Sequence, residues 1–506
     1  MQLTTLDWTI IATYLIGCMA AGLWMRRYVR SVEDFAVAGR SMDLNLGIAS
    51  LAATEMGIVT VMFTAEMGFK NGFAGATPGV LFFLAMLGVG MTGFVIVPLR
   101  DAGVITIPEL FEKRFGKSVR WLSGLVMALG GLLNMGIFLR LGGEFLVHAV
   151  GLDPGWLKLT MGTLLVLVLT YTILGGMLSV LITDYLQFLV MGLGIVLVSI
   201  WVIGTIGWSE LVGGLADAYA AQPPASSGGI MPILDHPFNP LASVGGWWLV
   251  WQMLLMVAGA VTWQPTITRV LSANSAATAK RIYCRTSFYF VGRFALPGLW
   301  GAAAFVYFWS HGGLPDGLDS RTATPAFLGQ ILPAGLIGML LAAMLAAEMS
   351  TDSGYLLTWA TVIYNDLVMP CFRRPVSQRA RLLTMRILVL AIAAFLLFYG
   401  LLYEIPGRAW DYVTVTATIY QASMLTLLVS VLYWRGAHRW GAYAAIVLGA
   451  AGPIAFLAIN FGGVQRVAPE VAGLSAFGLA FSGMLVGSWL GRRFGQKTGN
   501  ETGMSL

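Results

Sequence analysis

The stretch that decides the fold is Ala52-Ala53-Thr54-Glu55-Met56-Gly57-Ile58-Val59-Thr60, in the middle of an apolar run over residues 45–69. An acid, a glycine and β-branched residues at mid-span suit an unbroken helix poorly. A charge inside an apolar span is costly in lipid and usually has a function. We therefore expect this helix to be interrupted, because transporters bind cations with the backbone carbonyl groups that such a break leaves free.

A second stretch, Ala347-Glu348-Met349-Ser350-Thr351-Asp352-Ser353, lies in the apolar run over residues 331–369 and is dense in side-chain oxygen atoms. Hard cations such as sodium prefer oxygen ligands. The Ser and Thr hydroxyl groups could equally mediate helix packing or donate to backbone carbonyl groups. A cation site between the two stretches and a purely structural role both remain open on the residues alone.

The composition places the chain in lipid. Of its 506 residues 58% are hydrophobic and only 11% are charged, whereas an ordinary soluble protein is about 25% charged. The three cysteines lie far apart and indicate neither a disulfide framework nor a zinc site. The net charge of +6 comes from short basic clusters between apolar runs. Such clusters indicate which loops lie in the cytoplasm. We expect a lipid-embedded protein that does not bind nucleic acid.

Thirteen apolar runs are long enough to cross a bilayer as helices. Their residues do not alternate as those of barrel strands do, so the expected fold class is an all-α polytopic membrane protein. In chain order the runs cover approximately residues 5–25, 45–69, 74–98, 121–150, 157–175, 176–206, 242–271, 286–310, 331–369, 381–403, 409–433, 437–462 and 468–491.

The basic residues predict the orientation. Most of the 30 lysines and arginines fall in one set of alternate loops, which the positive-inside rule places in the cytoplasm. We expect an inner-membrane protein with its N-terminus outside and its C-terminus inside, which an odd number of spans requires. The first run precedes its basic residues, so it should be an anchor rather than a cleaved signal peptide. The clusters are Arg26–Arg40, Arg100–Arg120, Arg269–Arg285, Arg373–Arg381, Arg435–Arg439 and Arg492–Lys497.

Seven charged residues inside the expected spans are the candidates for a functional role. Arg293 lies about two turns from Arg285, and we expect it to extend to the membrane surface. Arg140 and Glu144 share one helix face and form either a structural ion pair or a ligand site. The carboxylates cannot all stay charged without a cation, so we expect them to pair with sodium, a proton, a cationic solute group or Arg140. The seven are Glu55, Arg140, Glu144, Asp184, Arg293, Glu348 and Asp352.

Short motifs follow one another between about residues 30 and 435. They are Ser31–Ser41 (SVEDFAVAGRS), Thr106–Gly116 (TIPELFEKRFG), Tyr171–Gly176 (YTILGG), Thr183–Gln187 (TDYLQ), Gln264–Arg269, Ala347–Ser353 and Ile363–Asp366 (IYND). Each is weak alone, but in this order and spacing they resemble the sodium:solute symporter family, which includes sodium/glucose, proline and sialic-acid carriers.

The resemblance implies a leucine-transporter-like fold with two inverted five-helix repeats. The helices over 45–69 and 242–271 should both be interrupted. The implied organisation is an extra helix and cytoplasmic loop over 1–44, a first repeat over 45–206, a second over 242–433, and two accessory helices with a short tail over 434–506.

The resemblance also implies a sodium site. Ala53, Met56 and Ala347 would contribute carbonyl oxygens, and Ser350 and Thr351 would contribute hydroxyl groups. A second cation site, known in some members, would involve Asp184, Asp352 and Ser353, although Gly354 stands where those members have a hydroxyl group.

The sequence says less about which solute the protein carries. The acid and the lysine that sugar-carrying members use have no counterpart here, so glucose and galactose are not expected. Glu55 would contact the solute first if the solute is cationic. Residues expected to line the solute path, or else to serve ordinary packing, are Glu55, Thr60, Arg140, Gln264, Tyr420 and Gln421.

These expectations favour a sodium-coupled symporter that imports a small organic solute by alternating access. A proton-coupled carrier of the same fold is the nearest alternative, because the buried acids could take up protons. A membrane-embedded solute sensor is less favoured, since no signalling domain follows the last run. An enzyme is least favoured, because neither a metal-binding His pair nor a nucleophile with a base is evident.

Overall fold

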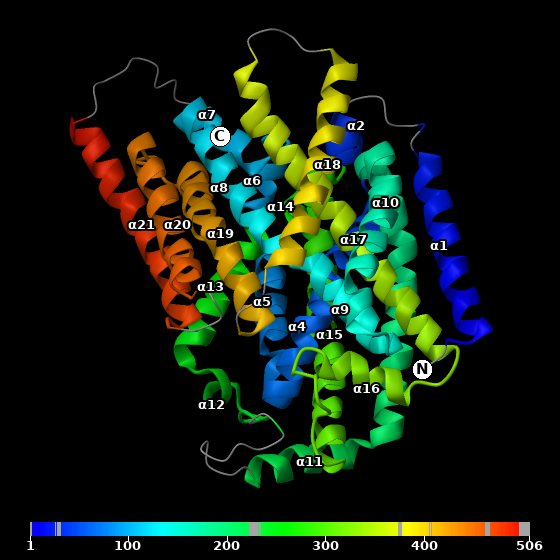
Figure 1. Ribbon diagram of the computed structural model, residues 1–506. Helices are drawn as coiled ribbons and strands as arrows, with labels where there is room; N and C mark the ends of the chain where they lie inside the picture. Colours follow the sequence, from blue (N-terminus) through cyan, green and yellow to red (C-terminus); the bar gives the residue numbers. More distant parts are fainter. Residues whose placement is uncertain are drawn as a thin grey trace.

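The protein is described here by a computed structural model that covers residues 3–25, 27, 32–221, 231, 234–372, 377–403, 405, 407–460 and 466–494. Within these ranges the regular structure is helical, without strands. Twelve helices in this part of the chain are long and apolar enough to cross a membrane. They lie side by side in one bundle (Figure 1).

The first half of the bundle carries the first of the two expected helix breaks. It consists of α1 (Thr5–Met25), α2 (Val32–Val37), α3 (Leu44–Glu55), α4 (Ile58–Asn71), α5 (Thr77–Thr92), α6 (Ile96–Asp101), α7 (Ile107–Phe115), α8 (Lys117–Met135), α9 (Phe138–Val150), α10 (Leu157–Ile206) and α11 (Trp208–Ala220).

The second half carries the other break. It consists of α12 (Pro240–Val244), α13 (Gly246–Thr262), α14 (Gln264–Ser272), α15 (Ala276–Ser310), α16 (Ala323–Ile331), α17 (Leu336–Val362), α18 (Gln378–Leu402), α19 (Ala409–Tyr433), α20 (Arg439–Ile459) and α21 (Pro469–Phe494).

The count of twelve takes the stretch 58–92 as one helix, although it contains parts of two expected spans. α4 ends at Gly72, whose φ of +54° lies outside the helical region. A short 3-10 turn over Gly72–Ala76 then leads into α5. The expected spans 45–69 and 74–98 are therefore separate here, the first as α3 with α4 and the second as α5 followed by α6.

Some boundaries differ from those expected. α15 begins at Ala276 rather than near residue 286, because its basic first turns continue the helix beyond the apolar run. The expected spans 157–175 and 176–206 are two separate spans, as expected; they share the label α10 and meet at a break at Gly176, where φ is +53°. The short helices α2, α7, α11, α12 and α16 were not expected, since they are not apolar runs; they lie near the two ends of the bundle (Figure 1).

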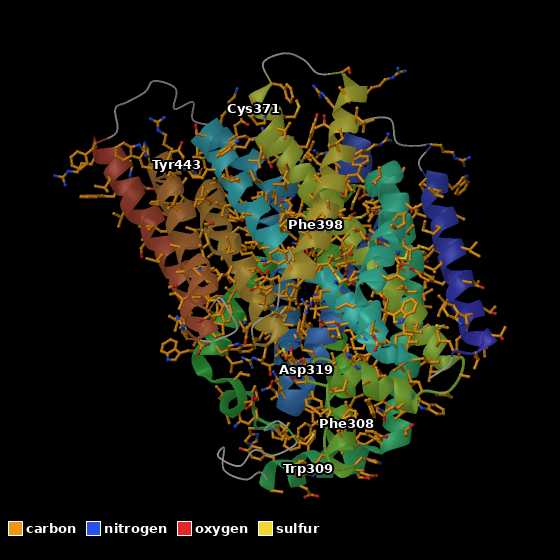
Figure 2. The ribbon with its side chains drawn as sticks, viewed as in Figure 1. Phe308, Trp309, Asp319, Cys371, Phe398 and Tyr443 are labelled. Carbon is orange, nitrogen blue, oxygen red and sulfur yellow. The ribbon has the colours of Figure 1, made fainter. Side chains whose placement is uncertain are left out.

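The polarity of the bundle is that of a protein in lipid. Large apolar side chains are exposed on the outer helices, for example Ile16, Leu189 and Phe481. Figure 2 labels another, Phe398 of α18, about halfway between the two ends. The interior, by contrast, contains buried carboxylates and arginines. Water-facing proteins have the opposite arrangement, so this surface fits a hydrocarbon environment.

The described ends of the chain lie at opposite ends of the bundle. α1 begins at the lower end in Figure 1, whereas α21 ends at the upper end, where α2 and α7 also lie. An odd number of crossings has this property. Several members of the expected cytoplasmic clusters, namely Arg26, Arg30, Arg373, Arg374 and Lys497, lie outside the described residues.

Close contact between α4 and α15 depends on glycine and gives a first prediction. A Cβ atom at Gly301 would overlap the carbonyl oxygen of Ala65, whereas one at Gly292 on the same helix would meet nothing within 4 Å. Gly301→Ala should therefore lower the free energy of unfolding by about 1–3 kcal/mol through overpacking. Thermal unfolding in lipid nanodiscs measures this, with Gly292→Ala as the matched control. Equal midpoints for the two variants would refute the close contact.

Candidate functional site

The first break lies where the sequence predicts it. α3 ends at Glu55, and α4 begins at Ile58. Met56 and Gly57 between them have φ/ψ values of −109°/66° and −77°/165°, outside the helical region. A Cβ atom at Gly57 would lie 2.7 Å from the Thr351 hydroxyl oxygen, so this glycine lets α17 approach the break.

The second break separates α13 from α14 at Trp263, whose φ/ψ values are −66° and 104°. Pro265 follows at the second position of α14. Proline has no N–H to donate to the preceding turn, and its ring collides with the carbonyl group four residues earlier, which favours a break between α13 and α14. Both interrupted helices implied by the family resemblance are thus present.

Thr351 of α17 lies against the first break, and the neighbouring Ser350 faces Asp184. The Thr351 hydroxyl donates to the carbonyl oxygen of Thr54 at 2.9 Å, and the Ser350 hydroxyl donates to Oδ1 of Asp184 at 2.6 Å. The other three expected sodium ligands, Ala53, Met56 and Ala347, are buried in the same core. The structure therefore brings the Thr351 hydroxyl group to the helix break from which the carbonyl ligands were expected, and the Ser350 hydroxyl group to Asp184.

Asp184 of α10 is bound by an arginine that the sequence analysis assigned to a cytoplasmic cluster. Arg269 of α14 is 1% exposed, and its Nη2 lies 3.3 Å from Oδ2 of Asp184. It also donates to Ser50, Thr54 and the carbonyl oxygen of Pro265. The assignment of Arg269 to a loop was wrong, because α14 is the second half of a broken helix inside the bundle.

Of the three residues expected at a second cation site, Asp352 does not face Asp184. Ser350 faces Asp184, and residues two positions apart on a helix point to nearly opposite sides, so Asp352 faces away. The Ser353 hydroxyl donates to the carbonyl oxygen of Ser350 at 3.2 Å. The place beside Asp184 is filled by the guanidinium group of Arg269.

Glu55 and Thr60, two of the expected solute contacts, are joined by Arg293 of α15. Arg293 Nη1 lies 3.1 Å from Glu55 Oε2, and its Nη2 donates to the Thr60 hydroxyl at 3.0 Å. The Thr266 hydroxyl donates to the other Glu55 oxygen at 2.6 Å. Arg293 does not extend to the membrane surface as expected, because it has a buried acid to neutralise.

Arg140 and Glu144 form the ion pair that their spacing allows. Arg140 Nε lies 3.0 Å from Glu144 Oε1, and Nη1 donates to the carbonyl oxygen of Tyr403 at 2.8 Å. The structure therefore contains the ion pair that was one of the two alternatives for Arg140 and Glu144. Arg140 makes no ion pair with Glu348 or Asp352 among the described residues.

Tyr420 and Gln421 of α19 reach the second break. The ring of Tyr420 stacks on that of Trp263 with centroids 6.0 Å apart. Gln264 begins α14 next to Trp263, and its side-chain oxygen accepts from the backbone N–H of Ile107 at 3.3 Å. The expected solute contacts thus fall into three places: the first break, the second break, and the Arg140 ion pair.

Comparison with known proteins identifies the class. A solved structure of a Na+-coupled sialic acid symporter in a substrate-bound, outward-open state superposes with a TM-score of 0.79 at 18% identity, over 97% of this chain and 98% of that one. MhsT in complex with L-phenylalanine gives a TM-score of 0.53 at 14% identity, over 88% and 98%. The fold is the leucine-transporter-like fold, as expected.

The chain belongs to the sodium:solute symporter family, whose model matches residues 35–449. It is 27% identical to the sodium/glucose cotransporter of Vibrio parahaemolyticus, over 88% of this chain and 84% of the relative. It is also 27% identical to the osmoregulated proline transporter OpuE of Bacillus subtilis, over 87% and 86%. The family and the expected class, a membrane transporter rather than an enzyme, are confirmed.

Proposed function

We propose that the protein is a sodium-coupled symporter that imports a small organic solute by alternating access. The observation that carries this is the meeting of Thr351 with the break between α3 and α4, with Ser350 next to it in α17. Unwound backbone beside hydroxyl groups on a neighbouring helix offers the oxygen ligands that sodium prefers. Family membership supports the same coupling ion.

The proposed sodium ligands are the carbonyl oxygens of Ala53, Met56 and Ala347 and the hydroxyl groups of Ser350 and Thr351. Thr351 donates to a backbone carbonyl group on the break, and Ser350 donates to Asp184. Because both hydroxyl groups are donors in these bonds, their oxygen lone pairs stay available to a cation. Sodium would tie α17 to the end of α3 and to the break that follows it, and would favour one arrangement of α3, α4 and α17.

The proposed solute path runs between the two breaks, past Glu55 and Thr60 on one side and Gln264, Tyr420 and Gln421 on the other. Arg140 is the outlying member of the proposed set, since its guanidinium group is engaged by Glu144. The proposed setting is an inner membrane with the upper end of Figure 1 in the cytoplasm. Arg100, Arg114 and Arg492 belong to helices whose basic ends lie there.

The hydroxyl ligands give the second prediction. Losing an oxygen that binds a charge costs roughly 1.5–3 kcal/mol, about ten- to a hundredfold in affinity. Ser350→Ala and Thr351→Ala should raise the sodium concentration for half-maximal uptake in proteoliposomes by that factor. Thr358→Ala is a control, because its hydroxyl donates to the Gly354 carbonyl oxygen of its own helix. Unchanged sodium dependence in both variants would remove the site.

Uptake by the same proteoliposomes distinguishes sodium coupling from the proton-coupled alternative. Sodium-coupled uptake requires a sodium gradient and persists when an ionophore collapses the pH gradient. Uptake that needs only a pH gradient would favour the alternative. Solute binding without uptake under either gradient would favour a sensor.

A further inference from the structure

Among the described residues, the buried carboxylates of the bundle have a basic partner or backbone donors, except for two acids of α17. Among the described residues, buried acids of the helices have basic partners: Glu55 with Arg293, Glu66 with Lys70, Glu144 with Arg140, Asp184 with Arg269, Asp366 with Arg120, and Asp411 with Arg408. Asp7 instead accepts from the backbone N–H groups of Gly335 and Gly338. Glu348 and Asp352 of α17 form no ion pair in this part of the chain.

Both exceptional acids are buried with unused acceptors. Glu348 is 1% exposed and Asp352 0%. Both carboxylate oxygens of Asp352 and Oε1 of Glu348 lack a hydrogen-bond partner. The backbone N–H of Ile58, at the start of α4, faces the Glu348 carboxylate. A helix N-terminus carries only a partial positive charge, so it does not balance two acids one turn apart.

The two acids continue into a cluster of aromatic rings. Glu348, Asp352, Tyr355 and Trp359 have the i, i+4, i+7, i+11 spacing that places side chains on one face of a helix. Tyr355 and Trp359 both pack against Trp263, with ring centroids 5.4 and 5.9 Å away. Tyr420 completes the aromatic cluster, which we define as Trp263, Tyr355, Trp359 and Tyr420.

The aromatic cluster also contains unused polar atoms. Nε1 of Trp359 and Oε1 of the neighbouring Gln421 are buried and have no hydrogen-bond partner. Buried tryptophan N–H groups and amide oxygens normally find partners when a site serves only packing. These atoms lie beside Trp263, at the break between α13 and α14. Along one face of α17, the unpaired acids near the start of α4 are thus followed by aromatic rings and unused polar atoms beside the second helix break.

This combination selects a ligand by its chemistry. Two acids without countercharge favour a cation, and three free carboxylate oxygens favour one with several N–H donors, which an ammonium or guanidinium group provides. Aromatic faces attract such cations as well. A sodium ion would engage the carboxylate oxygens alone and leave the aromatic rings unused. We propose that Glu348, Asp352 and the aromatic cluster bind a solute that carries an ammonium or guanidinium group, an inference that rests on the proposed transport function.

The first experiment compares matched compounds. The purified protein in lipid nanodiscs is heated in sodium buffer with putrescine or its uncharged analogue butane-1,4-diol, and with methylguanidine or its uncharged analogue methylurea. A ligand that binds only the folded state raises the unfolding midpoint. The charged member of at least one pair should raise it, and its uncharged analogue should not. Equal effects within both pairs, or no effect of either charged compound, would overturn the assignment.

The second experiment tests the residues with the stabilising compound. Glu348→Gln and Asp352→Asn should each weaken its affinity by about ten- to a hundredfold, and the sodium concentration for half-maximal stabilisation should stay within about threefold. Asp319→Asn, in the loop near the lower end in Figure 2, is the matched control. Lost sodium affinity with unchanged compound affinity would show that the acids hold the coupling ion. Compound binding that is indifferent to sodium would instead refute the proposed sodium coupling alone.

A third measurement needs no solute and guards against variants that merely misfold. An acid kept only for ligand binding destabilises the empty protein, so Asp352→Asn should raise the unfolding midpoint without solute. An acid that holds helices together would have the opposite effect. A lower midpoint for both Asp352→Asn and Glu348→Gln would show that the pair is structural and overturn the proposal.

Discussion

Replacement of Arg269 by Gln is expected to lower the free energy of unfolding by about 3–5 kcal/mol, because it leaves Asp184 charged and buried without a countercharge. Arg269 is the only ion-pair partner of Asp184 among the described residues, and both side chains are almost fully buried. Thermal unfolding in nanodiscs measures the loss. The double variant Arg269→Gln/Asp184→Asn should recover most of it, since it removes both charges.

Sodium should partly rescue the single variant. Without the guanidinium group, Asp184 would be left with the hydroxyl groups of Ser50, Thr54 and Ser350 around it, a set of oxygen ligands. Sodium chloride should therefore raise the unfolding midpoint of Arg269→Gln more than potassium chloride does. A double variant as unstable as the single one, together with no difference between the salts, would contradict the balancing role of Arg269.

The second large effect is expected at the first helix break. Glu55→Gln and Arg293→Gln should each lower stability by about 3–5 kcal/mol, because each leaves a buried charge unpaired. The double variant Glu55→Gln/Arg293→Gln should be as abundant as the wild-type protein, because it leaves no buried charge unpaired. Its solute affinity should nevertheless remain at least about tenfold weaker, a loss of about 1.4 kcal/mol, if Glu55 lies on the solute path.

Uptake kinetics in proteoliposomes distinguish a solute contact at Glu55 from a purely structural ion pair. A double variant that folds and transports with the wild-type KM would show that the Glu55–Arg293 pair serves structure alone. Thr266→Val is a useful companion, since it removes the hydroxyl group that donates to Glu55 but leaves both charges in place. It should have a smaller effect on unfolding than either charge variant.

The elements that could be predicted from sequence are those with local causes. Glycine and an acid at mid-span predicted the break after Glu55, and four-residue spacing allowed the Arg140–Glu144 pair. The pairs that sequence reasoning missed join residues far apart in the chain, 85 positions for Arg269 and Asp184 and 238 for Arg293 and Glu55. Nothing local identifies such partners. The signal available for Arg269 was its position inside an expected span rather than after it.

The helix boundaries show the same division. α19 has the bounds expected, because an apolar run ends abruptly at both sides. The start of α15 and the helix α11 were missed, since they continue beyond the apolar part of the chain and their helical pattern is not apolar throughout. Hydropathy identifies what lies in lipid, whereas the ends of helices depend on contacts outside it.

The guanidinium group on Asp184 also bears on how far the solute can be concentrated. It is a cation that belongs to the chain and is not released to the cytoplasm, so the proposed site at Ser350 and Thr351 would supply the single sodium of each cycle. One sodium crossing a tenfold gradient and 100 mV provides about 3.7 kcal/mol, which supports roughly 500-fold accumulation of an uncharged solute. A solute with one positive charge gains the membrane potential itself, about another fiftyfold. With Arg269 fixed at Asp184, the protein would accumulate its solute to a lower ratio but would use only one sodium ion for each solute molecule. The ratio of solute inside to solute outside, measured when net flux is zero, tests this directly.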